Sequence, residues 1–165
     1  MSQIQPAEAV KSTRAAAENP AHSIFVTLSI ADQLFGIPVL QVQDILGPQK
    51  ITRVPLAPPE VLGSLNLRGR IVTAIDVRIR LGLPLRPDDM RGMSIVVDHA
   101  GELYSLVVDK VGEIMNLSMA DYETNLVTLD PRWQDVSSGI YRLKDRLLVV
   151  LDVMRLLRLA QDEAA

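Results

Sequence analysis

The chain contains no cysteine, and only 4% of its 165 residues are aromatic. The absence of cysteine excludes disulfides, thiolate nucleophiles and cysteine-based metal sites. The few aromatic side chains leave little for nucleic-acid bases to stack on, and a net charge of −3 provides no basic surface. No apolar run reaches the roughly 18 residues that a membrane-spanning helix needs. These absences favour a cytoplasmic protein that neither binds nucleic acid nor inserts into a membrane.

The sequence offers little from which to build a catalytic or metal site. Its two histidines are His22, in the N-terminal tail, and His99, in an expected hairpin turn, and nothing places a nucleophile beside either. Asp88 and Asp89 lack the alternating spacing of a calcium loop, and no glycine-rich phosphate-binding motif is present. We expect no catalytic residue, no metal and no cofactor, and therefore a protein that acts by binding.

What the sequence does contain is an internal repeat. Residues 63–83 and 139–159, offset by 76 positions, share seven of 21 residues, and residues 35–45 are echoed by residues 104–114. Two copies of one unit predict two similar packed modules. The copies differ most at one turn, which reads Asn-Leu-Arg-Gly at 66–69 and Arg-Leu-Lys-Asp at 142–145. We therefore look for functional residues at that turn.

Short β-rich runs separated by turn residues dominate from Ser23 onward, and long crossover helices are absent. This pattern predicts a mainly β protein built from small barrels rather than an α/β sheet. Asp76 and Asp152 are placed to cap two short helices. The expected hairpins join residues 25–30 with 34–39, 64–67 with 70–75, 94–98 with 103–108, and 138–143 with 146–151; the expected helices are 59–62, 77–81 and 153–159, and residues 86–91 are expected to form a polar hinge.

Taken alone, the turn residues allow two interpretations. Gly69 supplies the positive φ that a tight hairpin needs, and Arg68 could be merely a solvated turn residue. Arginine is also a favoured interface anchor, which makes Arg68 a candidate contact residue. Asp44 either keeps an edge strand soluble or contributes to a binding surface. A small-molecule-binding barrel is the competing class of protein.

Five motifs occur in order along the chain. They are Phe-Gly-Ile-Pro at 35–38, Val-Gln-Asp-Ile at 42–45, Gly-Ser-Leu-Asn-Leu-Arg-Gly at 63–69, Ile-Asp-Val-Arg at 75–78 and Val-Val-Asp-Lys-Val at 107–111. Together they resemble the CheW family of bacterial chemotaxis coupling proteins, over roughly residues 23–160. The resemblance implies two five-stranded Src-homology-type β-barrels packed around a shared core, with short capped helices, in two subdomains at about 23–85 and 92–160 that exchange strands. Composition predicts a flexible tail at 1–22, and residues 161–165 are expected to form a C-terminal end.

The resemblance also implies a function. Such a protein is a non-catalytic adaptor that couples the cytoplasmic tip of methyl-accepting chemoreceptors to the regulatory domain of the CheA histidine kinase. It is cytoplasmic and is recruited to membrane-associated receptor arrays. A regulatory-domain-like barrel outside the chemoreceptor pathway is the alternative. Carried over by position, the receptor-binding residues are Val42, Asn66, Arg68 and Val108, and the kinase-binding residues are Asp44 (where the family commonly has Glu), Ile45 and Gly63.

Overall fold

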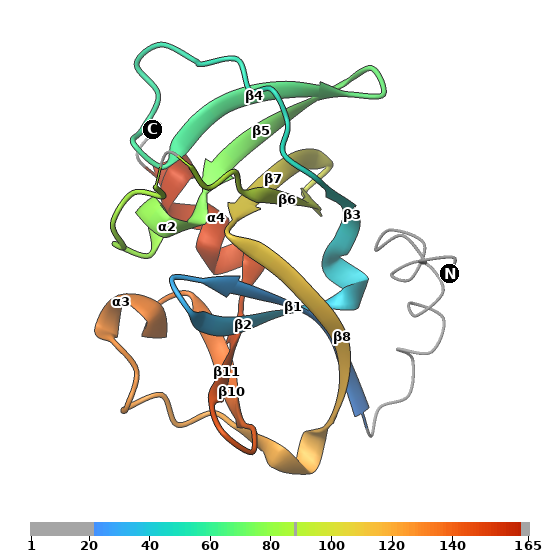
Figure 1. Ribbon diagram of the computed structural model, residues 1–165, viewed down its shortest axis with the longest axis vertical. Coiled ribbons are helices and arrows are strands. Elements are labelled where there is room, and N and C mark those ends of the chain that lie inside the picture. The colour runs from blue at the N-terminus through green and yellow to red at the C-terminus, as the bar shows by residue number, and fades with distance from the viewer. Residues whose placement is uncertain (1–21, 88, 163–165) are drawn as a thin grey trace.

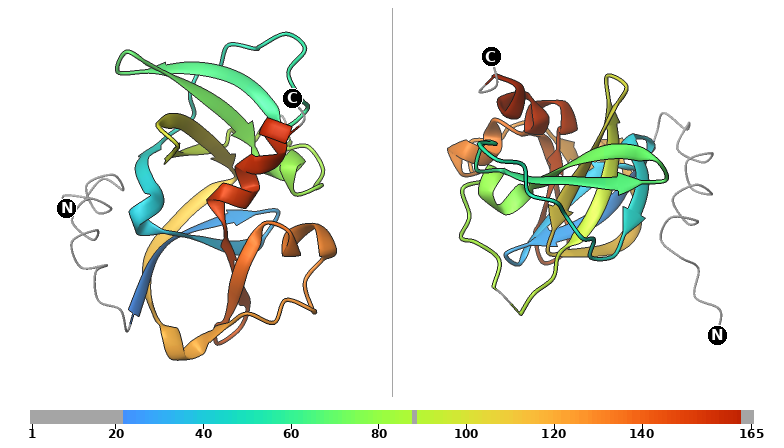
Figure 2. Two further views of the ribbon diagram at one scale, coloured as in Figure 1. Left: turned by 180° about the vertical axis from the view of Figure 1, so that it is seen from behind. Right: turned by 90° about the horizontal axis from the view of Figure 1, so that it is seen from above.

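A computed structural model describes residues 22–87 and 89–162. The expected tail at 1–22 lies outside the described residues, except that His22 begins the first strand. Figure 1 shows two β-sheets, one above the other, and Figure 2 shows helix α4 (Val153–Asp162) lying between them. The mainly β architecture with short capped helices is therefore confirmed.

Sheet A has six strands in the order β8-β1-β2-β11-β10-β9, and sheet B has five in the order β3-β6-β7-β5-β4. The two predicted barrels correspond to these two sheets. The short β9 adds a sixth strand to sheet A, and pairing among the described strands leaves both barrels open. The strands of sheet A are β1 (His22–Ile30), β2 (Gln33–Pro38), β8 (Lys110–Ser118), β9 (Tyr122–Glu123), β10 (Ser137–Arg142) and β11 (Leu147–Leu151). Those of sheet B are β3 (Val42–Leu46), β4 (Val61–Leu67), β5 (Arg70–Asp76), β6 (Met93–His99) and β7 (Glu102–Val108).

Each sheet draws strands from both repeats of the sequence. The hairpin β1–β2, near the start of the chain, completes sheet A, whose other strands all follow residue 109. The hairpin β6–β7, from the second half, lies in the middle of sheet B. Parallel pairing joins the exchanged hairpins to the resident strands, β2 to β11 in sheet A and β7 to β5 in sheet B.

The two sheets share one plan. Read from β3 in sheet B and from β8 in sheet A, the successive pairings are antiparallel, antiparallel, parallel and antiparallel in both. The bulges also correspond, since the one at Val61/Gly63 in β4 recurs at Ser137/Gly139 in β10. One row of neighbouring residues crosses sheet B as Asp44, Val96, Ser105, Ala74 and Gly63, and its counterpart in sheet A contains Thr27, Gly36, Val150 and Gly139.

One apolar core joins the sheets. Its fully buried members include Phe35 of β2, Leu106 of β7 and Leu156 of α4, so both sheets and the helix bury their facing sides together. Removing this much aliphatic surface from water is the main force that holds the sheets in contact. A smaller cluster fills the far side of each sheet, around Val96 in sheet B and around Tyr141 in sheet A.

The predicted helix caps are confirmed. The Asp76 carboxylate accepts the Arg78 N–H at 3.0 Å and begins α2 (Val77–Arg80), and the Asp152 carboxylate accepts the Arg155 N–H at 3.2 Å at the start of α4. α4 continues to Asp162, so residues 161 and 162 belong to this helix and not to a separate C-terminal end. Three further short helical segments lie in the described residues: η2 (Val39–Gln41), η3 (Met119–Asp121) and α3 (Pro131–Gln134).

The helix expected at 59–62 is wrong. The Val61 N–H donates to the Pro58 carbonyl at 2.9 Å in a turn, and β4 begins at Val61. Pairing of Val61 with Ile75 of β5 takes this residue into the sheet. Tertiary strand pairing therefore overrides the local proline signal.

Candidate functional site

The β4–β5 hairpin ends in a two-residue turn. Arg68 has a φ of 52° and Gly69 a φ of 83°, and positive values at both central residues define the type I′ turn that suits the twist of a hairpin. The Asn66 side-chain oxygen accepts the Gly69 N–H at 3.0 Å. A left-handed arginine costs roughly 1 kcal/mol or more relative to glycine at the same place. The turn therefore holds Arg68 in a fixed, mildly strained position, with 75% of its side chain exposed.

Arg68 reaches across sheet B to Asp44. Its guanidinium Nη2 lies 3.3 Å from the Asp44 carboxylate, whose side chain is only 8% exposed. Asp44 also accepts the N–H of Ile45 at 2.9 Å and follows the bulge in β3. β3 and β4 are opposite edges of the sheet, so this contact shows that sheet B curls until its two edges approach. The curled sheet thus presents one exposed cation above one nearly buried anion.

A shallow hollow of about 160 Å³ surrounds this ion pair. Its apolar floor is made by Leu67, Val96 and Leu103, and Gln43, Asp44, Arg68 and Arg70 stand around it. Arg70 donates to the Gly101 carbonyl at 3.2 Å, which ties the hairpin to the β6–β7 turn. We call this set of residues the Arg68 hollow. Such a hollow can bind an apolar side chain of another protein, and the two arginines at its rim can bind carboxylates beside that side chain.

The other residues assigned to receptor binding lie elsewhere. Val42 and Val108 are completely buried in the core that the two sheets share, so neither side chain lines a surface groove. The resemblance assigned Val42 to the groove as an apolar contact, whereas in the structure it lies beside the bulge in β3 with its side chain in the core. Asn66 is exposed, but its side chain builds the turn.

Two of the three residues assigned to kinase binding, Ile45 and Gly63, offer no exposed side chain. Ile45 is 7% exposed. Gly63 has a φ of 148°, and a Cβ at this position would collide with the backbone of Thr52, which pairs with Ser64. Asp44 is the member of this set that reaches the surface hollow, where it contacts Arg68 of the receptor set. The structure therefore joins, at one place, two residues that the resemblance assigned to different partners.

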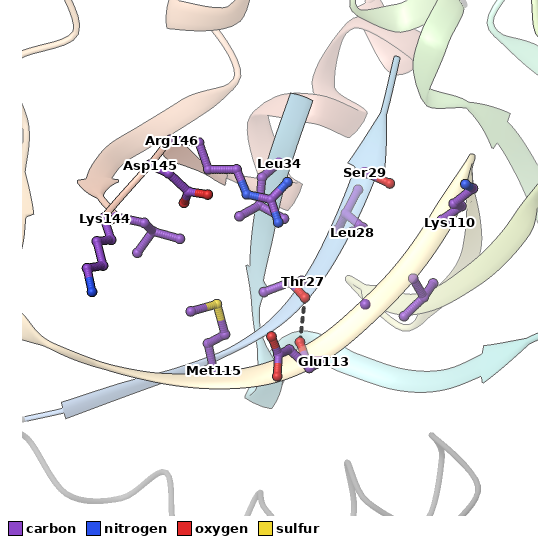
Figure 3. A pocket seen from close by; sticks show the side chains of 13 residues that line it. Thr27, Leu28, Ser29, Leu34, Lys110, Glu113, Met115, Lys144, Asp145 and Arg146 are labelled. Atoms are coloured by element: carbon purple, nitrogen blue, oxygen red, sulfur yellow. Dashed lines mark hydrogen bonds between the residues drawn. The ribbon is translucent and has the colours of Figure 1, made fainter. Parts of the chain in front are cut away.

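Sheet A carries a counterpart of the Arg68 hollow with different chemistry. By the repeat, Glu113 of β8 occupies the place of Asp44, and Lys144 occupies that of Arg68. In the described part of the chain no ion pair joins Glu113 to Lys144, and a hollow of about 540 Å³ opens between them. Figure 3 shows Lys144, Asp145 and Arg146 from the β10–β11 turn on one side of this hollow and Lys110 and Glu113 from β8 on another.

Four charged side chains form a buried cluster that the sequence reasoning missed. Asp109 accepts from Arg78 Nε at 2.8 Å and from Arg86 Nε at 3.0 Å, and Arg86 also lies 3.6 Å from Asp76. Arg86 was expected in a polar hinge, yet only 10% of its side chain is exposed. The one available signal was Asp109, a charge within an apolar run that had to find a partner.

The pKa of Asp109 reflects these contacts. Burial alone would raise the pKa of this carboxyl, because the charged form loses its hydration. Hydrogen bonds from Arg78, the Ala31 N–H and Arg86 outweigh burial and lower the pKa from 3.8 to about 2. Asp109 is therefore ionised at neutral pH and forms part of a satisfied ion network.

Within residues 22–87 and 89–162, no group of three or more histidine, aspartate or glutamate side chains is arranged to hold a metal ion. No helix in those same ranges is long and apolar enough to cross a membrane.

The chain is thus a binding module of two β-sheets related by a sequence repeat, and each sheet carries a surface hollow with its own chemistry. A sequence model of the CheW-like domain matches residues 25–161. The chain therefore belongs to the CheW-like family.

Individual relatives agree. The chemotaxis protein CheW of Helicobacter pylori is 30% identical over 134 residues, covering 81% of both chains. That of Klebsiella aerogenes is 27% identical over 139 residues, covering 81% of this chain and 80% of its own. The crystal structure of the scaffolding protein TtCheW from Thermoanaerobacter tengcongensis superposes with a TM-score of 0.70 at 27% identity, covering 78% of this chain and 88% of that one. The similarity confirms the Src-homology-like fold.

Proposed function

We propose that this chain is a non-catalytic chemotaxis adaptor that couples methyl-accepting chemoreceptors to a CheA-type histidine kinase. Membership of the CheW-like family supports the proposal, as do relatives named chemotaxis protein CheW and a structural neighbour described as a scaffolding protein. The observation that carries it is the Arg68 hollow, in which an exposed arginine is held in position above a nearly buried carboxylate. We further propose that the protein acts in the cytoplasm, at receptor arrays on the membrane.

The burial of the candidate residues narrows the contact surface. Asn66 and Arg68 present the turn to the receptor, and Asp44 presents the edge of β3 to the kinase. The side chains of Val42, Val108 and Ile45 are buried, and a Cβ at Gly63 would collide with the Thr52 backbone. These four residues therefore affect binding only by shaping the backbone. A receptor carboxylate that binds Arg68 competes with Asp44 for the same guanidinium. Binding of one partner would thereby alter the charge that the other meets, which is a direct route for coupling the two sites.

The functional subdomains follow the two sheets. Within the domain at 23–160, sheet B carries the Arg68 hollow, and sheet A is completed by the exchanged hairpin β1–β2. The division at 23–85 and 92–160 follows the sequence repeat. The division by sheets follows the strand pairing, and we propose it as the functional one.

The test is kinase autophosphorylation with receptor membranes and a CheA-type kinase, with and without this chain. We expect receptor-dependent activity that attractant suppresses only when the chain is present. Arg68→Ala should weaken receptor binding about tenfold, because an anchoring arginine contributes about 1–3 kcal/mol to an interface. Lys144→Ala, at the equivalent turn of sheet A, is the matched control. An unchanged receptor affinity of the folded Arg68→Ala protein would contradict the role given to Arg68.

A further inference from the structure

The buried charge cluster lies where the chain passes from one sheet to the other. Among the described strands the chain crosses between sheets twice, through η2 between β2 and β3, and at Asp109 between β7 and β8. Asp109 is thus the single residue that separates the last residue of a sheet B strand from the first residue of a sheet A strand. Asp76, Arg78, Arg86 and Asp109 are hereafter called the junction cluster.

The Asp109 carboxylate binds groups from both sheets. From the sheet B side, Arg78 Nε donates to Oδ1 at 2.8 Å, Arg78 Nη2 donates to Oδ2, and Arg86 Nε donates to Oδ1 at 3.0 Å. From the sheet A side, the N–H of Ala31, in the β1–β2 turn, donates to Oδ2 at 2.9 Å. Oδ2 is therefore shared between groups from the two sheets, whereas Oδ1 binds only the two arginines on the sheet B side.

The sheet A contact is made to a strained turn. Ala31 and Asp32 have φ values of 49° and 68°, so two residues with side chains adopt the left-handed conformation. Such residues cost of order 1 kcal/mol each and persist where the surroundings hold them. The bond from Ala31 to Asp109 is a contact that holds this turn against the junction.

The sheet B contacts hold the segment that follows α2. Arg78 Nη1 donates to the Pro84 carbonyl at 3.2 Å, and Arg86 donates to Asp109 while lying 3.6 Å from Asp76. Leu85, between these two anchored residues, is 73% exposed. This stretch is therefore held by polar contacts and not by burial of its own apolar side chain.

The equivalent crossing in the other repeat has apolar residues at the places of Asp109 and Arg78. By the repeat, Leu40 of η2 occupies the place of Asp109, and Met154 of α4 occupies that of Arg78. Leu40 is 50% exposed and Met154 is 55% exposed. At this crossing Asp152, the counterpart of Asp76, keeps its charge, but the counterparts of Asp109 and Arg78 are apolar. The common fold therefore does not require an Arg–Asp pair at this place. Buried ion pairs generally add little net stability over apolar residues, and some serve to specify one arrangement.

We propose that the junction cluster is a clamp that sets the orientation of sheet A relative to sheet B, and that Arg86 is the arm of the clamp that contacts both the Asp76 and the Asp109 carboxylates. The core between the sheets is apolar and non-directional, so it favours contact without selecting one angle. The forked, charge-assisted bonds to Asp109 supply that direction. The clamp is a property of the chain alone and does not depend on the proposed chemotaxis role.

The experiment uses the absence of cysteine in the chain. Ile71→Cys in β5, at a position that is 76% exposed, and Glu113→Cys in β8 provide two spin-label sites, one on each sheet. Pulsed electron paramagnetic resonance then measures the distance distribution between the sheets. We expect a narrow distribution in the otherwise unchanged chain and at least a doubling of its width, or a resolved second distance, with Arg86→Gln. This variant keeps the Arg78–Asp109 pair.

The control is Arg142→Gln. It removes the exposed pair with Glu123, 3.0 Å away, which joins strands within sheet A. This control should leave the width of the distance distribution unchanged.

If Arg86→Gln does not fold, Arg86→Lys is the second variant. It keeps the positive charge but loses the forked guanidinium, and it should also broaden the distance distribution. Amide exchange of Ala31 should rise with either variant. A folded Arg86 variant with an unchanged distance distribution would overturn the clamp.

Discussion

The two sheets are built on one plan but carry different surfaces. In sheet B the hairpin arginine, Arg68, lies 3.3 Å from the carboxylate on the opposite edge and leaves a hollow of about 160 Å³. In sheet A the equivalent lysine, Lys144, makes no such pair among the described residues, and the hollow measures about 540 Å³. The corresponding bulges at Gly63 and Gly139 are nevertheless retained. The two repeats therefore share a backbone plan, while the hairpin turn and the edge strand differ in their chemistry.

The largest expected effect concerns the two crossings. Asp109→Leu alone leaves Arg78 and Arg86 without their shared carboxylate and should cost about 3–5 kcal/mol of unfolding free energy. Adding Arg78→Met copies the Leu40 and Met154 pattern of the other crossing and should recover at least half of that loss. Urea unfolding of the single and double variants measures both values. A double variant no more stable than the single one would show that the crossings are not interchangeable.

The next effect compares the two equivalent glycines. A Cβ on Gly63 would meet the Thr52 backbone, whereas a Cβ on Gly139 would meet the ring of Tyr122, which is a side chain. Backbone cannot move aside as a side chain can, and Gly63 also has a φ of 148°. We expect Gly63→Ala to cost about 3 kcal/mol and Gly139→Ala about 1 kcal/mol. Equal losses in chemical denaturation would mean that Tyr122 is as rigid as the backbone.

A third effect depends on pH. The pKa of Asp109 is lowered in the folded protein from 3.8 to about 2, so this group stabilises the fold above pH 4, where the carboxylate is ionised in both states. That contribution, about 2 kcal/mol, should be lost as the pH falls from about 4 to about 2. Thermal melts across this range measure the loss. Asp109→Asn, if folded, should lose less stability over the same interval, and an identical pH profile would contradict the assignment.

The smallest effect concerns the paired hairpin turns. The Arg68–Asp44 pair involves a guanidinium that is 75% exposed, so solvent screens it, and Arg68→Ala should cost less than about 1 kcal/mol. Lys144→Ala removes no ion pair with the residues that the structure describes and should have no measurable effect on the melting temperature. A loss of several kcal/mol with Arg68→Ala would show that the pair holds the curl of sheet B, and binding data for that variant would need reinterpretation.

Local features of the fold could be predicted from the sequence. Hairpins, the caps at Asp76 and Asp152 and the turn glycine Gly69 follow from residue preferences within a few positions. The internal repeat indicated two modules. The parallel pairing of β2 with β11 could not be predicted in this way, because it joins residues more than 100 positions apart and has no local signature.

Side-chain direction limited the prediction of the site. The resemblance placed Val42 and Val108 in a groove, but both side chains are buried in the core, Val42 beside a bulge in β3 and Val108 at the end of β7. Arg86 was read as part of a polar hinge because nothing local indicates that it reaches Asp109, 23 positions away. Arg68 and Asp44 were both identified as candidates, and their mutual contact emerged only from the curl of the sheet.

Because the hairpins are exchanged, sheet B can form earlier during synthesis than sheet A. All five strands of sheet B lie between residues 42 and 108, so a ribosome has made every one of them well before the chain is finished. Sheet A cannot form until β11 joins β2, and this pairing closes a loop of more than 100 residues. During synthesis the hairpin β1–β2 therefore waits with an unpaired edge, which is the state in which a nascent chain is most exposed to wrong strand partners.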